Sequence, residues 1–265
     1  MSENPSARIL ALANQKGGVG KTTVCFNLAT ALTRAGHKVL LIDNDPQANL
    51  TAYTGVVVEP STLTLDQVYL ARDKRVLSLH DLSQVSAKLY LLPSDAALAG
   101  VEYYLVSRAA RESVLKAALE GLRKEFDFIL IDNPPSLNLL TLNGLMAAHG
   151  VLVPLQADFF SLEGLSQLEA TIRDLKRWNE NLEIVGIIRN VFDQRRRLNQ
   201  DVSKLLAEKF GSLLFETKIH NSVKVAESAG FGKSIFQYAP SSKSSAEFAE
   251  LAEELKIKLE RMSYV

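Results

Sequence analysis

One glycine-rich stretch separates a short apolar run from the start of a helical pattern: Asn14-Gln15-Lys16-Gly17-Gly18-Val19-Gly20-Lys21-Thr22-Thr23. Glycines let successive backbone N–H groups wrap around an anion without a clash from Cβ atoms. A lysine can meet the β- and γ-phosphates of a nucleotide, a hydroxyl can hold Mg²⁺, and a helix N-terminus adds partial positive charge. The residues suited to these roles are Gly17, Gly18, Gly20, Lys21 and Thr22.

The stretch departs from the strict pattern G-x-x-x-x-G-K-[ST]. That pattern requires glycine where this chain has Gln15, and the chain adds a second lysine, Lys16, before its first two glycines. A glycine-rich turn that opens a helix and binds nothing is the plainer interpretation, but the strand, loop and helix context favours a phosphate loop. The predicted nucleotide-contacting residues of the loop are Gly17, Gly18, Val19, Gly20, Lys21, Thr22 and Thr23.

Short apolar runs alternate with longer amphipathic stretches along the whole chain. Most apolar runs are continuous in Val, Ile and Leu, which is typical of parallel strands buried on both faces. The expected strands are Ile9–Ala13, Val39–Ile42, Leu89–Leu92, Phe128–Ile131, Val151–Pro154, Ile184–Ile188 and Leu213–Phe215. The expected helices are Lys21–Ala35, Arg108–Glu125, Leu162–Trp178, Asn199–Phe210 and Ser245–Met262. We therefore predict one α/β domain of the P-loop NTPase type over residues 1–265, with a mostly parallel sheet and helices on both faces.

The composition limits the partners and the compartment. The 265 residues include 30 Lys plus Arg and 30 Asp plus Glu, so any DNA binding must come from a local basic patch. A single cysteine, Cys25, allows no intramolecular disulfide and suits a reducing compartment. The tail of residues 1–8 is polar, and no apolar run is long enough to span a membrane. We expect a cytoplasmic protein.

Two expected strands end in carboxylates. Asp43 and Asp45 leave one strand two residues apart, and Asp132 ends another hydrophobic run. Because ligands bind at the carboxyl ends of parallel strands, these side chains are expected near Mg²⁺ and an attacking water. A strand-end Asp that caps a turn is the alternative, and it suits one Asp better than two. A hydrophobic run that ends in Asp is the general Walker B form, in which the carboxylate holds a water bound to Mg²⁺.

The stretch N-Q-K-G-G-V-G-K-T-T resembles the signature of the ParA/MinD family of deviant Walker A ATPases. The resemblance extends from Ile9 to about Leu259 and is nearest to the short ParA/Soj type, without the N-terminal helix-turn-helix domain of larger plasmid-type members. It implies ATP rather than GTP as the nucleotide. It also implies that Lys16 reaches the partner's phosphates in a nucleotide-sandwich homodimer, which makes Lys16, Lys21 and Asp45 the expected catalytic residues.

The same resemblance gives roles to several single residues. D-x-D-P-Q is the family's Walker A′ segment, so Asp45 is expected to act on the hydrolytic water and Asp43 to support phosphate sensing or the Mg²⁺ shell. The expected metal residues are Thr22, Asp43 and Asp132, the aspartates through water. Asn190 lies where members read the adenine edge, although a turn asparagine is an equal alternative. The family usually has a small residue at the position of Asn133.

A run of three arginines precedes the expected helix Asn199–Phe210. Cations near a helix N-terminus oppose the helix dipole, so another use is indicated, and DNA phosphate contact is the natural one. A solvated charge cluster is the alternative. By resemblance, Arg195 matches a non-specific DNA-binding arginine, and Lys224 replaces the arginine of the family's R-L-x-E-A-P-x-x-G-K stretch. The expected DNA-binding residues are Arg195, Arg196, Arg197 and Lys224.

These features together predict an ATP-dependent, dimerising ATPase that uses ATP and Mg²⁺ and hydrolyses slowly until a partner stimulates it. We expect it to associate with the nucleoid and, with a ParB-like protein, to partition a chromosome or plasmid. No membrane partner is expected, because the polar face of the last helix is rich in glutamate. Two alternatives remain: a related ATPase that positions a protein cargo, and a P-loop metabolic synthetase, against which Lys16 argues.

Overall fold

The computed structural model describes residues 6–158, 161–193, 195 and 197–262, and its strands form one sheet. The strand order is β3-β4-β2-β5-β1-β6-β7-β8. The strands are β1 Arg8–Leu12, β2 Val39–Asp43, β3 Ser83–Ser86, β4 Leu89–Leu92, β5 Phe128–Asp132, β6 Gly150–Leu155, β7 Glu183–Phe192 and β8 Leu214–His220. Each neighbouring pair is parallel except β3 with β4. The predicted α/β class with a mostly parallel sheet is confirmed.

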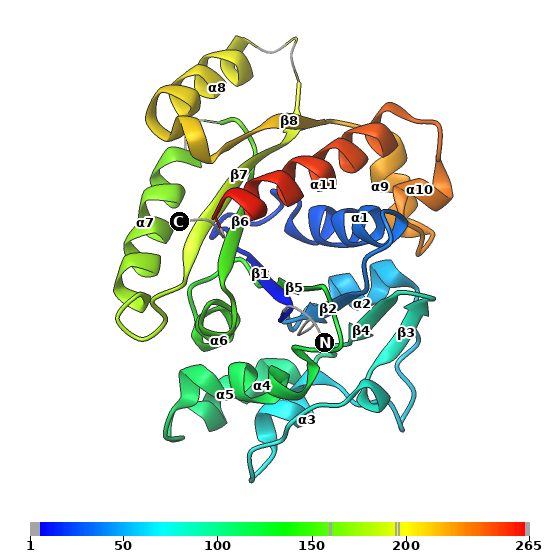
Figure 1. Ribbon diagram of the computed structural model, residues 1–265, viewed down its shortest axis with the longest axis vertical. Coiled ribbons are helices and arrows are strands. Elements are labelled where there is room, and N and C mark those ends of the chain that lie inside the picture. The colour runs from blue at the N-terminus through cyan, green and yellow to red at the C-terminus, as the bar shows by residue number, and fades with distance from the viewer. Residues whose placement is uncertain (1–5, 159–160, 194, 196, 263–265) are drawn as a thin grey trace.

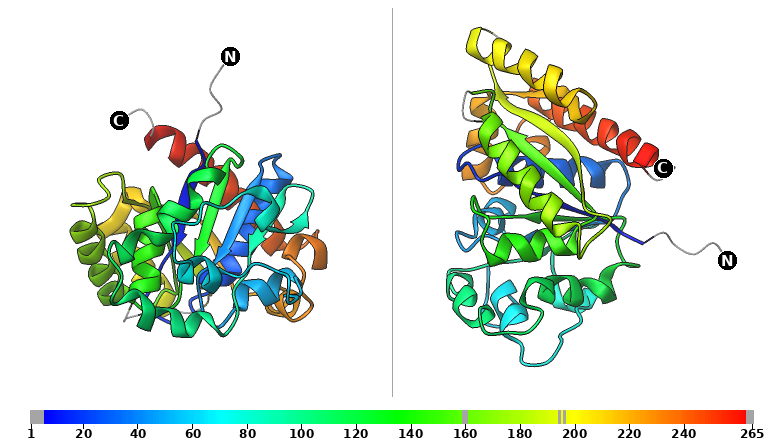
Figure 2. Two further views of the ribbon diagram at one scale, coloured as in Figure 1. Left: turned by 90° about the horizontal axis from the view of Figure 1, so that it is seen from below. Right: turned by 90° about the vertical axis from the view of Figure 1, so that its left-hand side faces the viewer.

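Helices cover both faces of this sheet (Figures 1 and 2). They are α1 Lys21–Arg34, α2 Asn49–Thr54, α3 Leu65–Leu70, α4 Leu98–Leu105, α5 Val114–Ala118, α6 Leu139–Ala147, α7 Ser161–Leu175, α8 Arg197–Phe210, α9 Val223–Gly230, α10 Ile235–Tyr238 and α11 Lys243–Met262. No helix in the described ranges is long and apolar enough to cross a membrane.

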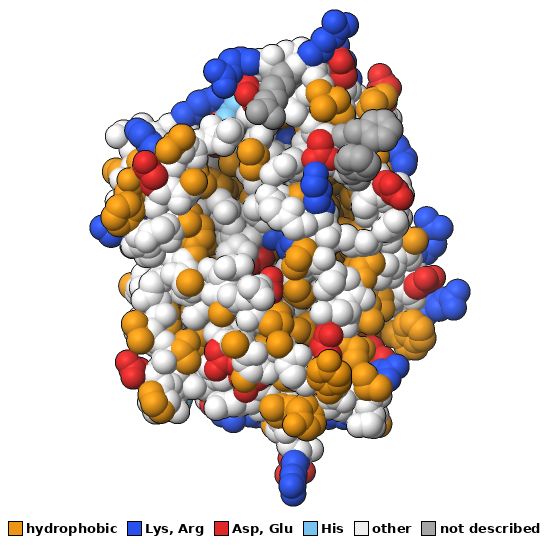
Figure 3. Space-filling view, turned by 180° about the vertical axis from the view of Figure 1, so that it is seen from behind, with side chains coloured by type: hydrophobic (Ala, Val, Ile, Leu, Met, Phe, Trp, Pro, Cys, Tyr) orange, Lys and Arg blue, Asp and Glu red, His pale blue; other side chains and the backbone are white. Residues whose placement is uncertain are grey.

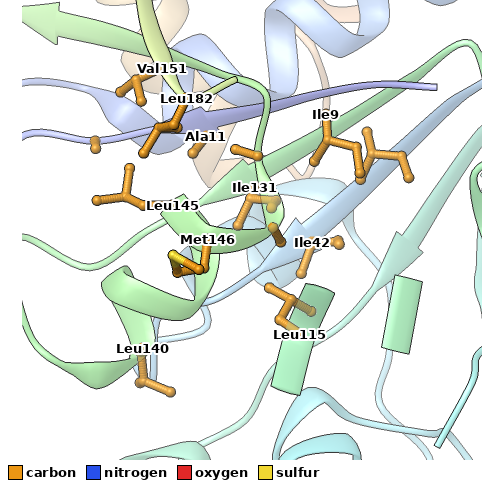
Figure 4. Packing of buried hydrophobic residues seen from close by; sticks show 14 of the residues in the cluster. Ile9, Ala11, Ile42, Leu115, Ile131, Leu140, Leu145, Met146, Val151 and Leu182 are labelled. Carbon is orange, nitrogen blue, oxygen red and sulfur yellow. The ribbon is translucent and has the colours of Figure 1, made fainter. Parts of the chain in front are cut away.

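Successive residues of a strand point to opposite faces, so each strand contributes to two cores. Ile9 and Ala11 of β1 join the core under α3 to α8, while Leu10 and Leu12 join the core under α1, α2, α10 and α11. Figure 4 shows part of the first core, with Ile131 of β5 and Leu145 of α6 among its members. The strands are therefore buried on both faces, as their continuous apolar runs predict.

The continuous helix expected over Arg108–Glu125 is wrong. That region contains two 3₁₀ turns around the short helix α5. The chain enters it through Ala110 in the left-handed region, at φ 52°. The Asn143 side chain of α6 then donates to the Arg111 carbonyl at 2.7 Å and accepts from Leu115 N at 3.2 Å, so it replaces bonds within the helix. Tertiary contacts with α6 override the local helical pattern here.

Candidate nucleotide site

The glycine-rich loop connects β1 to α1 at the carboxyl edge of the sheet. Gly18 and Gly20 have φ of 74° and 84°, in the left-handed region that favours glycine. A Cβ atom on Gly20 would lie 2.1 Å from Asn190 Nδ2, so space as well as backbone conformation requires glycine. Lys21 follows as the first residue of α1. The local structure therefore presents backbone N–H groups and a helix N-terminus in one place, as an anion site needs.

A cavity of about 510 Å³ opens over this loop. It is lined by Gly17, Gly18, Gly20, Lys21, Thr22, Thr23, Asp45, Gln47, Asn49, Ala52, Tyr53, Pro135 and Ala229. Figure 3 looks onto this side and shows a hollow near its centre, with basic and acidic side chains at the floor. Another cavity, of about 560 Å³, contains Arg8 and His149 near the amino ends of the strands and touches none of the loop. Of these two cavities, the first joins the loop to Asp45, so it is the candidate for the nucleotide.

Lys21 and the acidic strand ends form one electrostatic unit. The Lys21 side chain is buried and its Nζ donates to the Asn14 carbonyl at 3.2 Å. Burial lowers the pKa of the Lys21 ammonium, and the nearby charges of Asp132 and Asp45 oppose that shift. A phosphate group in the cavity would oppose it further, because an anion favours the charged lysine.

Asp43 is buried and has partners for both carboxylate oxygens. Its Oδ2 accepts from the backbone N and the hydroxyl of Thr51, each at 2.7 Å, and its Oδ1 accepts from Asp45 N at 3.3 Å. Burial raises the pKa of Asp43 to about 6, against the effect of these hydrogen bonds. This geometry assigns Asp43 to holding the loop that carries Asp45. Its part in the Mg²⁺ shell stays a prediction.

Asp132 lies opposite Asp43 in the β2–β5 register. It is hydrogen-bonded to the Thr22 side chain, and burial followed by the charge of Asp43 raises its pKa. Among the described residues its Oδ1 atom has no hydrogen-bond partner although it is buried. A buried polar atom of this kind calls for a partner, and Mg²⁺ prefers oxygen ligands with retained waters. The Thr22 hydroxyl and the Asp132 carboxylate therefore fit the implied metal.

Lys16 projects from the loop and forms an ion pair with Asp158, in the segment after β6. Its side chain is 40% exposed, and its backbone N donates to Asn14 Oδ1 at 3.0 Å. Within the single chain the Lys16 ammonium is thus held by its own carboxylate partner. Sequence reasoning missed Asp158, because the two residues lie 142 positions apart and no motif surrounds Asp158.

Asn190 lies in β7, against the phosphate loop. Its side-chain Nδ2 donates to the Val19 carbonyl at 2.7 Å. The next residue, Val191, has φ 52°, a rare conformation for a β-branched residue and a mark of local strain. The structure gives the Asn190 amide a role in bracing the loop, which the sequence did not indicate. Its adenine-reading role stays a prediction.

The basic residues lie beyond β7 and β8, neighbouring parallel strands whose ends pair at Phe192 and His220. The Arg195 side chain is 87% exposed and contacts both oxygens of Asp193, at 3.1 and 3.2 Å. Arg197 is 95% exposed and lies 3.8 Å from Asp201.

The third arginine of the run, Arg196, lies outside the described residues. Lys224 is exposed in the first turn of α9.

Helix α8 begins at Arg197 rather than at Asn199. The Asn199 side chain accepts from Asp193 N through Oδ1 at 2.9 Å and donates through Nδ2 to the Ala157 carbonyl at 2.7 Å. Figure 3 shows Lys and Arg side chains along the upper rim of this side.

Comparison with known proteins identifies a matching family model and similar proteins. A family model described as an AAA domain matches residues 7–184. The chromosome partitioning protein ParA of Caulobacter vibrioides is 41% identical over 258 residues, which cover 96% of each chain. The chromosome-partitioning ATPase Soj of Thermus thermophilus is 41% identical over 255 residues, covering 96% of this chain and 97% of that one.

Solved structures also match the fold of nearly the whole chain. The cobyrinic acid a,c-diamide synthase of Mycobacterium smegmatis with bound ADP and magnesium matches with a TM-score of 0.80 and 35% identity over 93% of each chain. An ATP complex of a Cyanothece McdA variant matches with a TM-score of 0.81 and 25% identity, covering 98% of this chain and 97% of that one. The expected resemblance is confirmed over nearly the whole sequence, and the chain belongs to the ParA/Soj family of P-loop ATPases.

Proposed function

We propose that this ATPase is a switch that dimerises around ATP, binds double-stranded DNA non-specifically and, with a ParB-like partner, partitions a chromosome or plasmid. The observation that carries this proposal is the cavity in which the phosphate loop, Lys21 and Asp45 meet, with Lys16 projecting from the same loop. The names of the ParA and Soj relatives support the partitioning role. Such a protein works in the cytoplasm, on the nucleoid.

Within the site, each residue has a definite task. The backbone N–H groups of Gly17 to Thr22 would hold the phosphates, and the Lys21 ammonium would meet their charge. Thr22 and Asp132 would hold Mg²⁺, which supplies charge neutralisation between the phosphates when bound. Asp45, half-buried at the cavity wall, would orient the attacking water, because a carboxylate at that place can accept a hydrogen bond from it.

The switch requires that ATP favours one state over another. In the single chain, the Lys16 ammonium pairs with Asp158 at a partly exposed position, where an ion pair contributes about 0–1 kcal/mol. A partner's triphosphate carries more charge than one carboxylate and offers Lys16 a stronger contact. Dimerisation would therefore exchange a weak pair within the chain for a stronger pair between chains, and loss of the γ-phosphate would reverse the exchange.

DNA binding would use the exposed cations beyond β7 and β8. Because the formal net charge of the chain is zero, the affinity requires a local basic patch such as this one, and it must depend on salt. If both protomers contribute Arg195, Arg197 and Lys224, the slope of log K against log salt is about −5. The exposed side chains contact phosphates rather than base edges, so little sequence preference is expected.

The test measures binding to a fluorescent duplex of arbitrary sequence, with ATP, with ADP and without nucleotide, across a salt series. We expect binding with ATP alone, with a steep loss as salt rises. Equal binding in all three states would contradict the switch. Absence of binding with ATP, with ADP and without nucleotide would remove DNA binding from the proposed function and leave only the ATPase activity.

A synthetase remains the second candidate, because the Mycobacterium smegmatis protein with the matching structure carries the name of a diamide synthase. A synthetase consumes ATP only together with its small-molecule acid. The protein proposed here would hydrolyse ATP with Mg²⁺ alone and faster with DNA and a ParB-like protein. Purified protein assayed without any acid substrate therefore separates the two functions.

A further inference from the structure

Two buried asparagines link the acidic strand ends. Asn44 lies between Asp43 and Asp45, Asn133 directly follows Asp132, and both asparagines are almost fully inaccessible, at 0% and 1%. Their side chains meet, because Asn44 Nδ2 donates to Asn133 Oδ1 at 2.8 Å. The last paired residues of β2 and β5 are Asp43 and Asp132. The side-chain bond therefore continues the cross-link between β2 and β5 by one residue beyond the paired strands.

Further hydrogen bonds fix the two side chains from three other elements. The Tyr69 hydroxyl of α3 donates to Asn44 Oδ1 at 3.0 Å. Asn44 Nδ2 also donates to the Leu140 carbonyl of α6 at 2.7 Å, and Asn133 Nδ2 donates to the Leu12 carbonyl of β1 at 3.1 Å. Both amides use their donors and acceptors within the core, and a fully satisfied buried network of this kind is rigid and specific.

Packing leaves the network little freedom to move. A Cβ atom on Gly144 of α6 would lie 2.2 Å from Asn133 Oδ1, so this helix approaches Asn133 as closely as a glycine allows. The Asn44 backbone N donates to the Asp132 carbonyl at 2.9 Å, which fixes the same two strand ends a second time. The network thus ties the loop that bears Asp45 to the end of β5, where Asp132 lies.

We propose, on the basis of the roles given above to Asp45 and Asp132, that Asn44 and Asn133 are positioning residues for ATP hydrolysis. Their hydrogen bond holds the water-orienting carboxylate of Asp45 at a fixed distance from the metal-side carboxylate of Asp132. A misplacement of about 1 Å in a catalytic group can cost about 10²-fold in rate. The bond acts on the chemical step, and the backbone N–H groups that hold the phosphates lie in another loop. Loss of the bond therefore lowers kcat and spares ATP affinity.

The test compares Asn44→Leu, Asn133→Ala and the double variant in kcat, in affinity for a fluorescent ATP analogue and in melting temperature. Each single variant is expected to lower kcat by about 10- to 100-fold and to change nucleotide affinity less than about twofold. The double variant is expected to be no slower than the slower single variant, because the same bond is lost in all three. Tyr69→Phe removes one hydroxyl and preserves the packing. It should lower kcat by several-fold in a well-folded protein.

Asn143→Leu provides the matched control. Asn143 is equally buried on α6 and donates to two backbone carbonyls, but it bonds to neither strand end. If Asn44→Leu, Asn133→Ala and Tyr69→Phe lower only the melting temperature, as Asn143→Leu should, the positioning role is overturned. Independent, multiplicative losses in kcat for the two asparagines would also overturn it. Unchanged turnover by Asp45→Ala would overturn it at its premise, whether or not the protein binds DNA.

Discussion

The phosphate-loop region and the basic segment beyond β7 lie at the same edge of the sheet but are built differently. Lys21 is 7% exposed and lies near the buried Asp132 and the half-buried Asp45, while the Arg197 side chain is 95% exposed beside one carboxylate at 3.8 Å. Buried charges interact strongly because little water screens them, and exposed pairs contribute about 0–1 kcal/mol. One region can therefore direct chemistry through single residues, whereas the other must act through the sum of weak contacts.

The largest effect should come from the phosphate-loop region. Asp45→Ala removes the carboxylate proposed to orient water and should slow hydrolysis by about 10²- to 10⁴-fold while ATP still binds. Light scattering should then find a dimer that persists with ATP. Turnover close to the wild-type rate would remove Asp45 from the mechanism and weaken the contrast between the two regions.

Lys16 is intermediate between the two regions, because its side chain is 40% exposed. Lys16→Ala should weaken ATP-dependent dimerisation by about 10²- to 10⁴-fold, because the homodimer loses two charged hydrogen bonds, each worth about 1.5–3 kcal/mol. ATP should still bind the single chain through the loop that holds Lys21. Sedimentation with and without ATP measures the dimer. If the variant dimerises at wild-type affinity, Lys16 does not act across an interface.

Substitutions in the basic segment should change how strongly the DNA affinity depends on salt. Arg195→Ala should weaken DNA binding on all sequences alike and reduce the salt slope by about 1 for each protomer. Asp193→Asn should act in the opposite direction, because it removes the carboxylate that contacts Arg195 at 3.1 Å. Arg177→Ala is the control, since Arg177 is exposed near the amino ends of the strands. An unchanged slope for Arg195→Ala would place the DNA contacts elsewhere.

The smallest effect should come from Asp158. Asp158→Asn removes the partly exposed carboxylate partner of Lys16 and should lower the ATP concentration needed for dimerisation by only a few-fold, in line with the small energy of a partly exposed pair. Dimerisation measured against ATP concentration checks this shift. A shift in the opposite direction would mean that Asp158 supports the dimer rather than the single chain.

Residues that are close in the chain were predictable. The loop from Lys16 to Thr23 is contiguous because an anion site needs successive backbone N–H groups. Asp43 and Asp45 are near neighbours because both lie at the carboxyl end of one strand, where ligands bind. The buried parallel strands were predictable from continuous apolar runs. Edge strand β3 was missed, because its exposed and half-exposed polar residues form no such run.

The short helices α2, α3, α4, α6, α9 and α10 were also missed. They have 4 to 9 residues, too few for a helical period to show clearly in the sequence. The chain over residues 108–125 carried a helical pattern, but hydrogen bonds with the Asn143 side chain accompany its division into two 3₁₀ turns and the short helix α5. Hydrophobic periodicity indicates which residues are buried. It does not indicate which side chains from distant segments will replace the hydrogen bonds within a helix.

By itself, the sequence determined the nucleotide chemistry, the positions of the buried parallel strands along the chain and the two acidic strand ends. Only the tertiary structure decided what holds these groups in place: Asp158 on Lys16, Asn190 on the Val19 carbonyl and Asn133 on Asn44. The partners in these three contacts lie 142, 171 and 89 positions apart. Local patterns encode which groups a site needs, and the packing of distant segments sets the distances between them.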